Sequence, residues 1–130
     1  LKVNISQLEA LTELVCGKLT KLQRKVLVAL ITVDVHARDI VDTLQQEGTN
    51  RQDAFGWQMQ LRYYWDEAND IITVRQVNMQ FNYAYEYLGA QGRLVVTPMT
   101  DRCYMTLTGA LGLKLGGAPA GPAGTGKTET

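Results

Sequence analysis

The sequence predicts an α+β chain in two parts, a helical segment with a β-hairpin followed by the incomplete N-terminal part of an α/β module. Three observations predict this order. Apolar residues recur at steps of three and four in the first third of the chain, the period of an amphipathic helix. Two β-branched and aromatic runs then flank a polar turn. A glycine-rich P-loop pattern closes the sequence, and such loops join a strand to a helix in α/β modules.

The first third of the chain is expected to be helical. Ser6 and Glu9 have the spacing of a capping box, and we expect one long helix or two helices in near line, with a weak point at Gly17 because glycine disfavours a helix interior. A second helical stretch is expected at 35–44, followed by a polar loop at 45–53. The apolar positions that set the period are Leu8, Leu11, Val15, Leu19, Leu22, Val26, Leu30 and Val33.

The middle of the chain is expected to be extended. Leu61–Trp65 and Ile71–Val74 flank a polar turn, which predicts a hairpin. Residues 77–87 alternate between apolar and polar side chains, which predicts a strand with one buried face. Residues 94–96 are expected to form a short apolar strand or edge. The side chains expected in the sheet core are Phe81, Tyr83, Tyr85 and Tyr87.

A last helix is expected from about Thr100 to Leu115. Thr97 and Pro98 suit its start, since proline is favoured at the first helical position. The pair Gly116–Gly117 suits its end. A short strand around Ala118 would then lead into the P-loop.

Composition excludes several classes of protein. The chain has 130 residues and a formal net charge of zero, so it lacks the basic field of a general binder of nucleic acid or anionic membranes. Cys16 and Cys103 lie inside apolar helical patterns, and we expect buried thiols rather than a disulfide or a zinc site. The longest apolar run, at 26–35, is too short to span a bilayer. A cytosolic protein is expected.

The C-terminal pattern, residues 121–128, satisfies the Walker A consensus in full, and each residue type has a physical role. Gly121, Gly124 and Gly126 let backbone N–H groups turn toward a phosphate. Lys127 supplies a cation between the β- and γ-phosphates, and the Thr128 hydroxyl completes a magnesium shell. The pattern predicts binding of ATP or ADP with Mg²⁺.

Hydrolysis needs further groups that this sequence does not supply. An acid that polarises water, a γ-phosphate sensor and an arginine from a neighbouring module cannot be assigned. The sequence stops at Thr130, where the phosphate-binding helix should begin, so we expect a segment of a longer polypeptide. The apolar run at 94–96 before Pro98 has two interpretations of equal weight, a slot for adenine or an ordinary core strand.

Five strings spread along nearly the whole chain are distinctive in this order: 34–39 (DVHARD), 60–65 (QLRYYW), 85–89 (YEYLG), 97–104 (TPMTDRCY) and 116–130 (GGAPAGPAGTGKTET). Together they resemble dynein heavy chains, and the axonemal ones in particular.

The resemblance implies that residues 1–82 are the C-terminal part of the linker, with its helices and hairpin, and that residues 83–130 open the first AAA+ module. That module is the main ATP hydrolysis site of the family, with Lys127 and Thr128 as its catalytic residues here and Thr128 as the metal ligand. The same likeness assigns Leu94, Val95 and Pro98 to adenine, and it assigns to the phosphates and magnesium Gly121, Gly124, Thr125, Gly126, Lys127, Thr128 and Glu129.

The resemblance also implies an ATP-driven microtubule motor that couples ATP binding and hydrolysis to the swing of the linker and to ciliary or flagellar movement. Its partners would be the AAA+ ring, stalk and tail of the same heavy chain, microtubules through the stalk, and dynein intermediate and light chains, with no nucleic acid and no membrane. Its location would be the cytoplasm and cytoskeleton, in the axoneme of a cilium or flagellum. Two alternatives stay open, a non-motor AAA+ remodelling ATPase and a scaffold with a non-hydrolysing nucleotide site.

Overall fold

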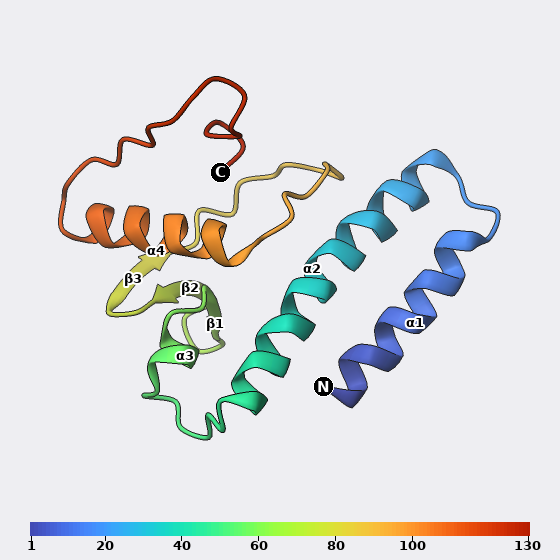
Figure 1. Cartoon of the computed structure of the whole chain (residues 1–130), viewed down its shortest axis with the longest axis horizontal. Helices are drawn as coiled ribbons and strands as arrows, with labels where there is room; N and C mark the ends of the chain where they lie inside the picture. Colours follow the sequence, from blue (N-terminus) through green and yellow to red (C-terminus); the bar gives the residue numbers. More distant parts are fainter. The chain divides into compact units, whose positions relative to one another are not determined.

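The computed structural model describes all of residues 1–130, and the chain divides into two compact units. The first comprises Leu1–Gly48 and Glu86–Val95, and the second comprises Thr49–Tyr85 and Val96–Thr130. Helices and one three-stranded antiparallel sheet confirm the α+β class (Figure 1). No helix combines the length and apolar character that a membrane crossing needs. The elements are α1 (Lys2–Cys16), α2 (Lys21–Gln46), α3 (Phe55–Gln58), β1 (Arg62–Asp66), β2 (Ile71–Gln76), β3 (Met79–Asn82) and α4 (Pro98–Gly112).

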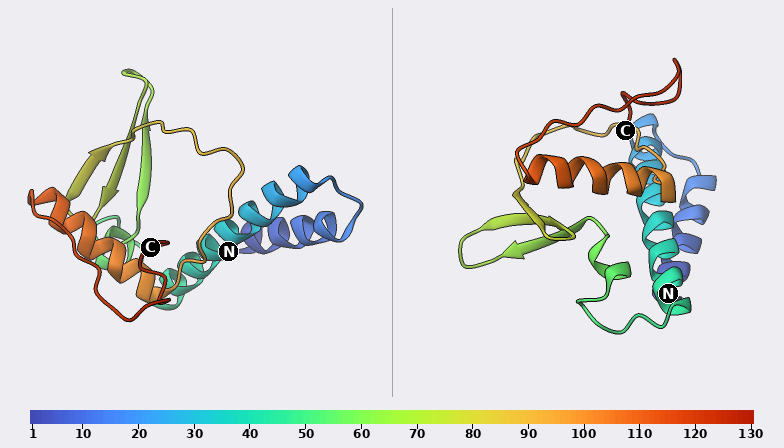
Figure 2. Two further views of the ribbon diagram at one scale, coloured as in Figure 1. Left: turned by 90° about the horizontal axis from the view of Figure 1, so that it is seen from above. Right: turned by 60° about the vertical axis from the view of Figure 1, so that its left-hand side comes forward.

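Helices α1 and α2 lie side by side and antiparallel (Figures 1 and 2), so the expectation of one helix or two in near line is wrong. The pair buries Leu8 and Leu11. Gln7 Nε2 donates a hydrogen bond to Asp34 Oδ2 at 2.8 Å across the pair. The chain reverses because Gly17 leaves α1 in an extended conformation, with φ −78° and ψ −178°, and α2 then starts with a cap of its own.

The capping box belongs to α2 and not to α1. Thr20 Oγ1 accepts from Gln23 N at 3.3 Å, and Gln23 Oε1 accepts from Thr20 N at 2.9 Å. Ser6 lies inside α1, which begins at Lys2, so the box predicted from Ser6 is wrong. Arg24 Nη1 donates to the Val15 carbonyl at 3.0 Å and satisfies a carbonyl that the end of α1 leaves without an intrahelical partner. Helix α2 runs unbroken to Gln46, so 35–44 is not a separate helix.

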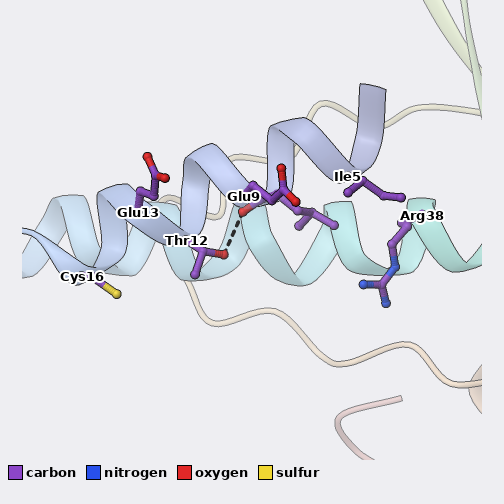
Figure 3. A pocket seen from close by; sticks show the side chains of 7 residues that line it. Ile5, Glu9, Thr12, Glu13, Cys16 and Arg38 are labelled. Atoms are coloured by element: carbon purple, nitrogen blue, oxygen red, sulfur yellow. Dashed lines mark hydrogen bonds between the residues drawn. The ribbon is translucent and has the colours of Figure 1, made fainter. Parts of the chain in front are cut away.

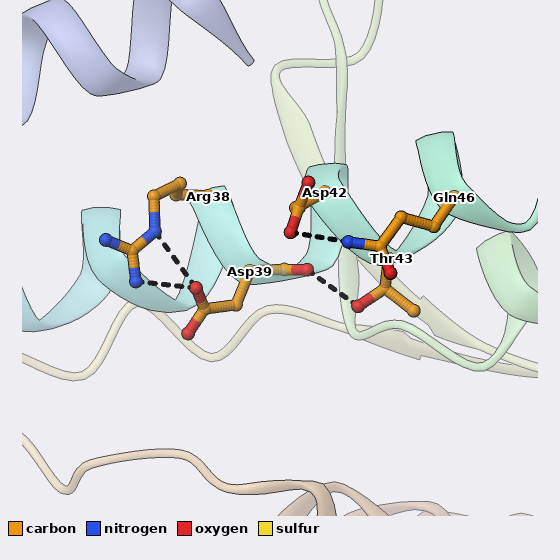
Figure 4. Close-up of polar contacts among 5 residues, drawn as sticks. All are labelled: Arg38, Asp39, Asp42, Thr43 and Gln46. Atoms are coloured by element: carbon orange, nitrogen blue, oxygen red, sulfur yellow. Dashed lines mark hydrogen bonds and ion pairs between the residues drawn. The ribbon is translucent and has the colours of Figure 1, made fainter.

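The polar side of α2 is tied together by local contacts (Figure 4). Arg38 forms an ion pair with Asp39, with Nη2 2.6 Å from Oδ1, and Gln46 Nε2 donates to Asp42 Oδ2 at 2.9 Å. These groups are exposed, so each contributes little to stability.

Much apolar surface of the helical unit stays exposed. A groove of about 650 Å³ runs along α1, lined by Leu8 and by the side chains labelled in Figure 3, which are Ile5, Glu9, Thr12, Glu13, Cys16 and Arg38. Cys16 is exposed, contrary to the expected buried thiol, and so is Cys103 of α4. The α2 side chains left largely in water are Leu22, Val26, Val28, Leu30 and Val33.

The predicted hairpin is confirmed. Strands β1 and β2 pair in antiparallel register, with Tyr63 opposite Val74 and Trp65 opposite Ile72. The turn between them is closed by Asp66, whose carboxylate accepts from Asn69 Nδ2 at 2.8 Å. This hydrogen bond lowers the pKa of Asp66 below its usual value, because it favours the ionised carboxylate.

The third strand is shorter than the alternating pattern predicts. It covers only Met79–Asn82, because Val77 turns the chain at φ 51° and Tyr85 leaves the extended region at φ 55°. Beyond the strand, Tyr83 N still donates to the Ile72 carbonyl at 2.9 Å. The Tyr85 hydroxyl then accepts from Ile72 N at 2.7 Å. A side-chain oxygen thus accepts the hydrogen bond that a backbone carbonyl of a neighbouring strand would otherwise accept.

The expected aromatic core is wrong for three of its four members. Only Phe81 is half-buried, whereas Tyr83, Tyr85 and Tyr87 are exposed. The rings of Tyr83 and Tyr85 pack edge to face, 5.2 Å apart. The alternation of apolar and polar residues at 77–87 therefore does not by itself indicate burial. The apolar face of a strand is buried only where another strand or helix packs against it.

We expect Tyr85→Phe to weaken the outer edge of the sheet by about 1 kcal/mol, because the Ile72 N–H loses its acceptor. Hydrogen exchange at the Ile72 amide should quicken by roughly fivefold. Tyr87→Phe, at an exposed tyrosine, is the matched control. Equal exchange in the two variants would show that the hydroxyl contributes nothing to the ladder.

Helix α4 packs on the sheet in the second unit. Thr97 caps it by accepting from Thr100 N, and Pro98 is its first residue, as predicted. Gln76, only 2% exposed, joins three elements: its Oε1 accepts from Thr108 Oγ1 at 2.7 Å, and its Nε2 donates to the Met59 carbonyl at 3.0 Å. Gly112 allows this approach, since a Cβ there would lie 1.9 Å from Met79 Sδ.

The predicted end of α4 and the two short strands expected on either side of this helix are wrong. The helix ends at Gly112, before the expected Gly116–Gly117, because the chain turns through Lys114 at φ 62°. Residues 94–96 and the neighbourhood of Ala118 form no strand. A strand needs a partner for its backbone groups, and the sheet of this chain consists of β1, β2 and β3 alone.

Candidate functional site

The glycine-rich loop after α4 has the backbone of an anion-binding turn. Gly124 and Gly126 take φ values of 76° and 78°, in the left-handed region that side chains disfavour. The Gly126 carbonyl accepts from Glu129 N and from Thr130 N, both at 3.1 Å, so a first turn of helix-like bonding follows the loop. The backbone N–H groups of Gly124, Gly126, Lys127 and Thr128 donate to no acceptor within the chain. Such groups can bind an anion together.

Lys127 folds back over this loop. Its Nζ donates to the Gly121 carbonyl at 2.9 Å and also to the Pro122 carbonyl, and it lies 3.3 Å from Thr125 Oγ1. Thr125 Oγ1 in turn donates to the Pro122 carbonyl at 2.8 Å. Lys127 is half-buried, whereas the other residues of 121–130 are exposed. The loop thus holds its one cation at its centre.

A cavity of about 670 Å³ lies between this loop and α4, within the second unit. Its lining includes the predicted site residues Gly121, Thr125 and Lys127. The volume falls in the range of small-molecule sites. One face of α4 forms the other wall, through Met99, Arg102, Cys103, Thr106, Leu107 and Ala110.

The remaining predicted residues lie elsewhere. Thr128 and Glu129 are exposed in the turn that follows Lys127 and do not line the cavity. Pro98 is the first residue of α4 and also lies outside the lining. Leu94 and Val95 belong to the first unit and are 38% and 65% exposed. Gly124 and Gly126 do not line the cavity either, so of the predicted residues its lining contains Gly121, Thr125 and Lys127.

The α4 wall is the part that sequence reasoning missed. Arg102 and Cys103 line the cavity together with Thr106, one turn further along the helix. The signal was present in the helical spacing of 99, 102, 103 and 106, which puts these residues on one face.

The loop has the residue pattern of the P-loop class, with a glycine-rich turn, a lysine and a hydroxyl residue directly after it. Residues 83–130 match the family model described as "Hydrolytic ATP binding site of dynein motor region". The chain is 60% identical over 129 residues to human dynein axonemal heavy chain 6, and these residues are 99% of this chain and 3% of that relative. It is 61% identical over 124 residues to human dynein axonemal heavy chain 1, which is 95% of this chain and 3% of the relative.

Human dynein axonemal heavy chain 2 is 54% identical over 129 residues, 99% of this chain and again 3% of the relative. Nearly the whole chain is thus similar to dynein axonemal heavy chains, which confirms the resemblance in its sequence. It spans about 3% of the length of these relatives.

Proposed function

We propose that this chain supplies the phosphate-binding half of the ATP site in the first AAA+ module of an axonemal dynein motor. The observation that carries the proposal is the loop centred on Lys127, which lies inside the segment similar to a hydrolytic ATP-binding site of dynein. In the proposed division, residues 1–82 are the C-terminal part of the linker and residues 83–130 open the module.

Each loop residue has a part in binding ATP or ADP. The N–H groups of Gly124 and Gly126 donate to phosphate oxygens, and Lys127 exchanges its loop carbonyls for the β- and γ-phosphates. Gly121 leaves room for this movement, because a Cβ there would lie 3.2 Å from Thr125 Oγ1. Glu129 lies one residue beyond the loop, near the phosphates. Leu94, Val95 and Pro98 would flank the adenine.

Magnesium fits the donor set. The Thr128 hydroxyl is exposed and makes no hydrogen bond within the chain, and it is a hard oxygen ligand of the kind Mg²⁺ prefers. When bound, the ion neutralises charge on the phosphates. Thr128 would hold it beside the loop.

Hydrolysis and movement are proposed for the whole heavy chain. ATP binding at this loop would be coupled to a swing of the linker, with the AAA+ ring, stalk and tail of the same polypeptide as the first partners. Microtubules, intermediate chains and light chains would be the others, in the axoneme of a cilium or flagellum. The relatives found are dynein heavy chains, so neither a remodelling ATPase nor a non-hydrolysing scaffold is favoured.

The two exposed cysteines provide a test of where nucleotide binds. Cys103 lines the cavity and Cys16 lies in the other unit. In the intact heavy chain, we expect saturating MgATP to slow alkylation of Cys103 by roughly tenfold or more, because a bound ligand covers most of the walls of its pocket. Peptide mass spectrometry after a timed pulse of N-ethylmaleimide measures both thiols in one sample.

Alkylation of Cys16 is the internal control and should be unchanged by MgATP. Protection of neither cysteine would contradict the proposed site. Equal protection of both would indicate a general change in the chain rather than a ligand in this cavity.

A further inference from the structure

One face of α4 presents a charged side chain to the cavity. Arg102 lies one turn after Met99 and one turn before Thr106, and all three line the same wall. Its guanidinium donates no hydrogen bond to another residue of the chain and forms no ion pair. Arg102 is exposed, so its donors are available to a ligand.

The charged side chains that line the cavity are all positive. Arg102 and Lys127 carry the only charged side chains of the lining, which contains no Asp or Glu. The nearest acids in sequence, Asp101 and Glu129, both lie outside the lining. Two cations facing one cavity without a counter-charge favour an anionic ligand.

We propose that Arg102 is a second cationic contact for the phosphate chain of the nucleotide, placed across the cavity from Lys127. This rests on the proposed function, and it adds a residue from α4 to a site otherwise built from the loop. A guanidinium offers five donors in a planar fork and pairs with two phosphate oxygens at once.

The lining favours a phosphate over the base as the partner of Arg102. No aromatic side chain lines the cavity, so no stacking surface for a purine lies beside the guanidinium. The rest of the lining is residues 116–122 together with Thr125, Lys127 and Thr130. Arg102 thus faces the groups that the loop is built to hold, which are anions.

The test uses the intact heavy chain. It measures the nucleotide concentration that halves the rate of Cys103 alkylation, a midpoint that reports on this site alone. Arg102→Gln should raise that midpoint roughly tenfold for MgATP and for ADP, the effect of losing one charge-assisted contact. Arg102→Lys should recover part of the loss, and the midpoint for adenosine should stay unchanged. Arg93→Gln, an exposed arginine outside the cavity, is the matched control.

Unchanged midpoints for ATP and ADP in Arg102→Gln would overturn the proposal, and so would an equal rise for adenosine, which would assign Arg102 to the nucleoside. Hydrogen exchange across α4 must match wild type, and faster exchange would assign a structural role instead. If MgATP protects Cys103 in the wild type and Arg102→Gln has the same midpoint as the wild type, only the Arg102 proposal fails. If MgATP protects no form of the protein, the proposed function fails with it.

Discussion

Replacing Lys127 with alanine is expected to raise the Kd for MgATP at this site by at least about 100-fold, equivalent to about 2.7 kcal/mol. The ammonium is the only charged group of the loop 121–128 and is held at its centre by the Gly121 and Pro122 carbonyls. Without it, the β- and γ-phosphates would keep only the backbone N–H groups as loop donors. Charge-assisted hydrogen bonds are among the strongest that proteins make.

The measurement is ATP-dependent protection of Cys103 in the intact heavy chain, followed by its ATPase rate. Lys114→Ala is the matched control, because Lys114 is an exposed lysine in the turn after α4 and lies outside the cavity. A Lys127→Ala protein that kept wild-type protection at the same ATP concentration would contradict the assignment of the loop as a phosphate site.

Gln76→Leu is expected to destabilise the contact between the sheet and α4 by about 2 kcal/mol. Leucine fills a similar volume, but the Met59 carbonyl loses its donor and Thr108 Oγ1 loses its acceptor on the sheet. Thr108 keeps a partner, since its hydroxyl also lies 2.9 Å from the Tyr104 carbonyl. The cost therefore comes mainly from the Met59 carbonyl, which is left unpaired beside a nearly fully buried side chain.

Hydrogen exchange of β2 and α4 measures this effect, and local opening should become roughly 30-fold more frequent. Gln80→Leu on β3 is the control, because Gln80 is exposed and makes no side-chain hydrogen bond. Similar exchange in the two variants would mean that the buried amide does not hold α4 on the sheet.

Local patterns in the sequence predicted local structure well. The hairpin followed from an aromatic run and a β-branched run on the two sides of a turn that begins at Asp66, whose side chain closes that turn. The start of α4 followed from Thr97 and Pro98, because capping depends on a few neighbouring residues.

Features that depend on distant partners could not be predicted in the same way. An apolar series at steps of three and four is the same for one long helix and for two antiparallel ones, and only the packing of Leu8 and Leu11 distinguishes them. Alternation at 77–87 did not show where pairing stops, since that depends on Ile72 and on the backbone at Tyr85. Gln76 carried no signal, because a buried glutamine is recognised only from its partners.

The candidate site likewise has one part that a local motif predicts and another part that depends on contacts between distant residues. A motif predicts the loop, because the roles of Gly121, Gly126 and Lys127 follow from residue type and spacing within eight positions. Arg102 is about twenty residues away on a helix, and its place on the cavity wall depends on how the chain returns after Gly117. A Cβ at Gly117 would lie 2.3 Å from Leu107 Cδ2, so a side chain there would have to displace Leu107.

At the proposed phosphate site, the carbonyls that hold Lys127 would compete with the ligand. The ammonium would have to leave Gly121 and Pro122 before phosphates could take it, so only a fraction of molecules would be ready to bind at any moment. The apparent affinity is the intrinsic affinity multiplied by that fraction. Residues that tighten or loosen the hold of these carbonyls on Lys127 would therefore shift the ATP concentration that the proposed site needs, without touching the nucleotide.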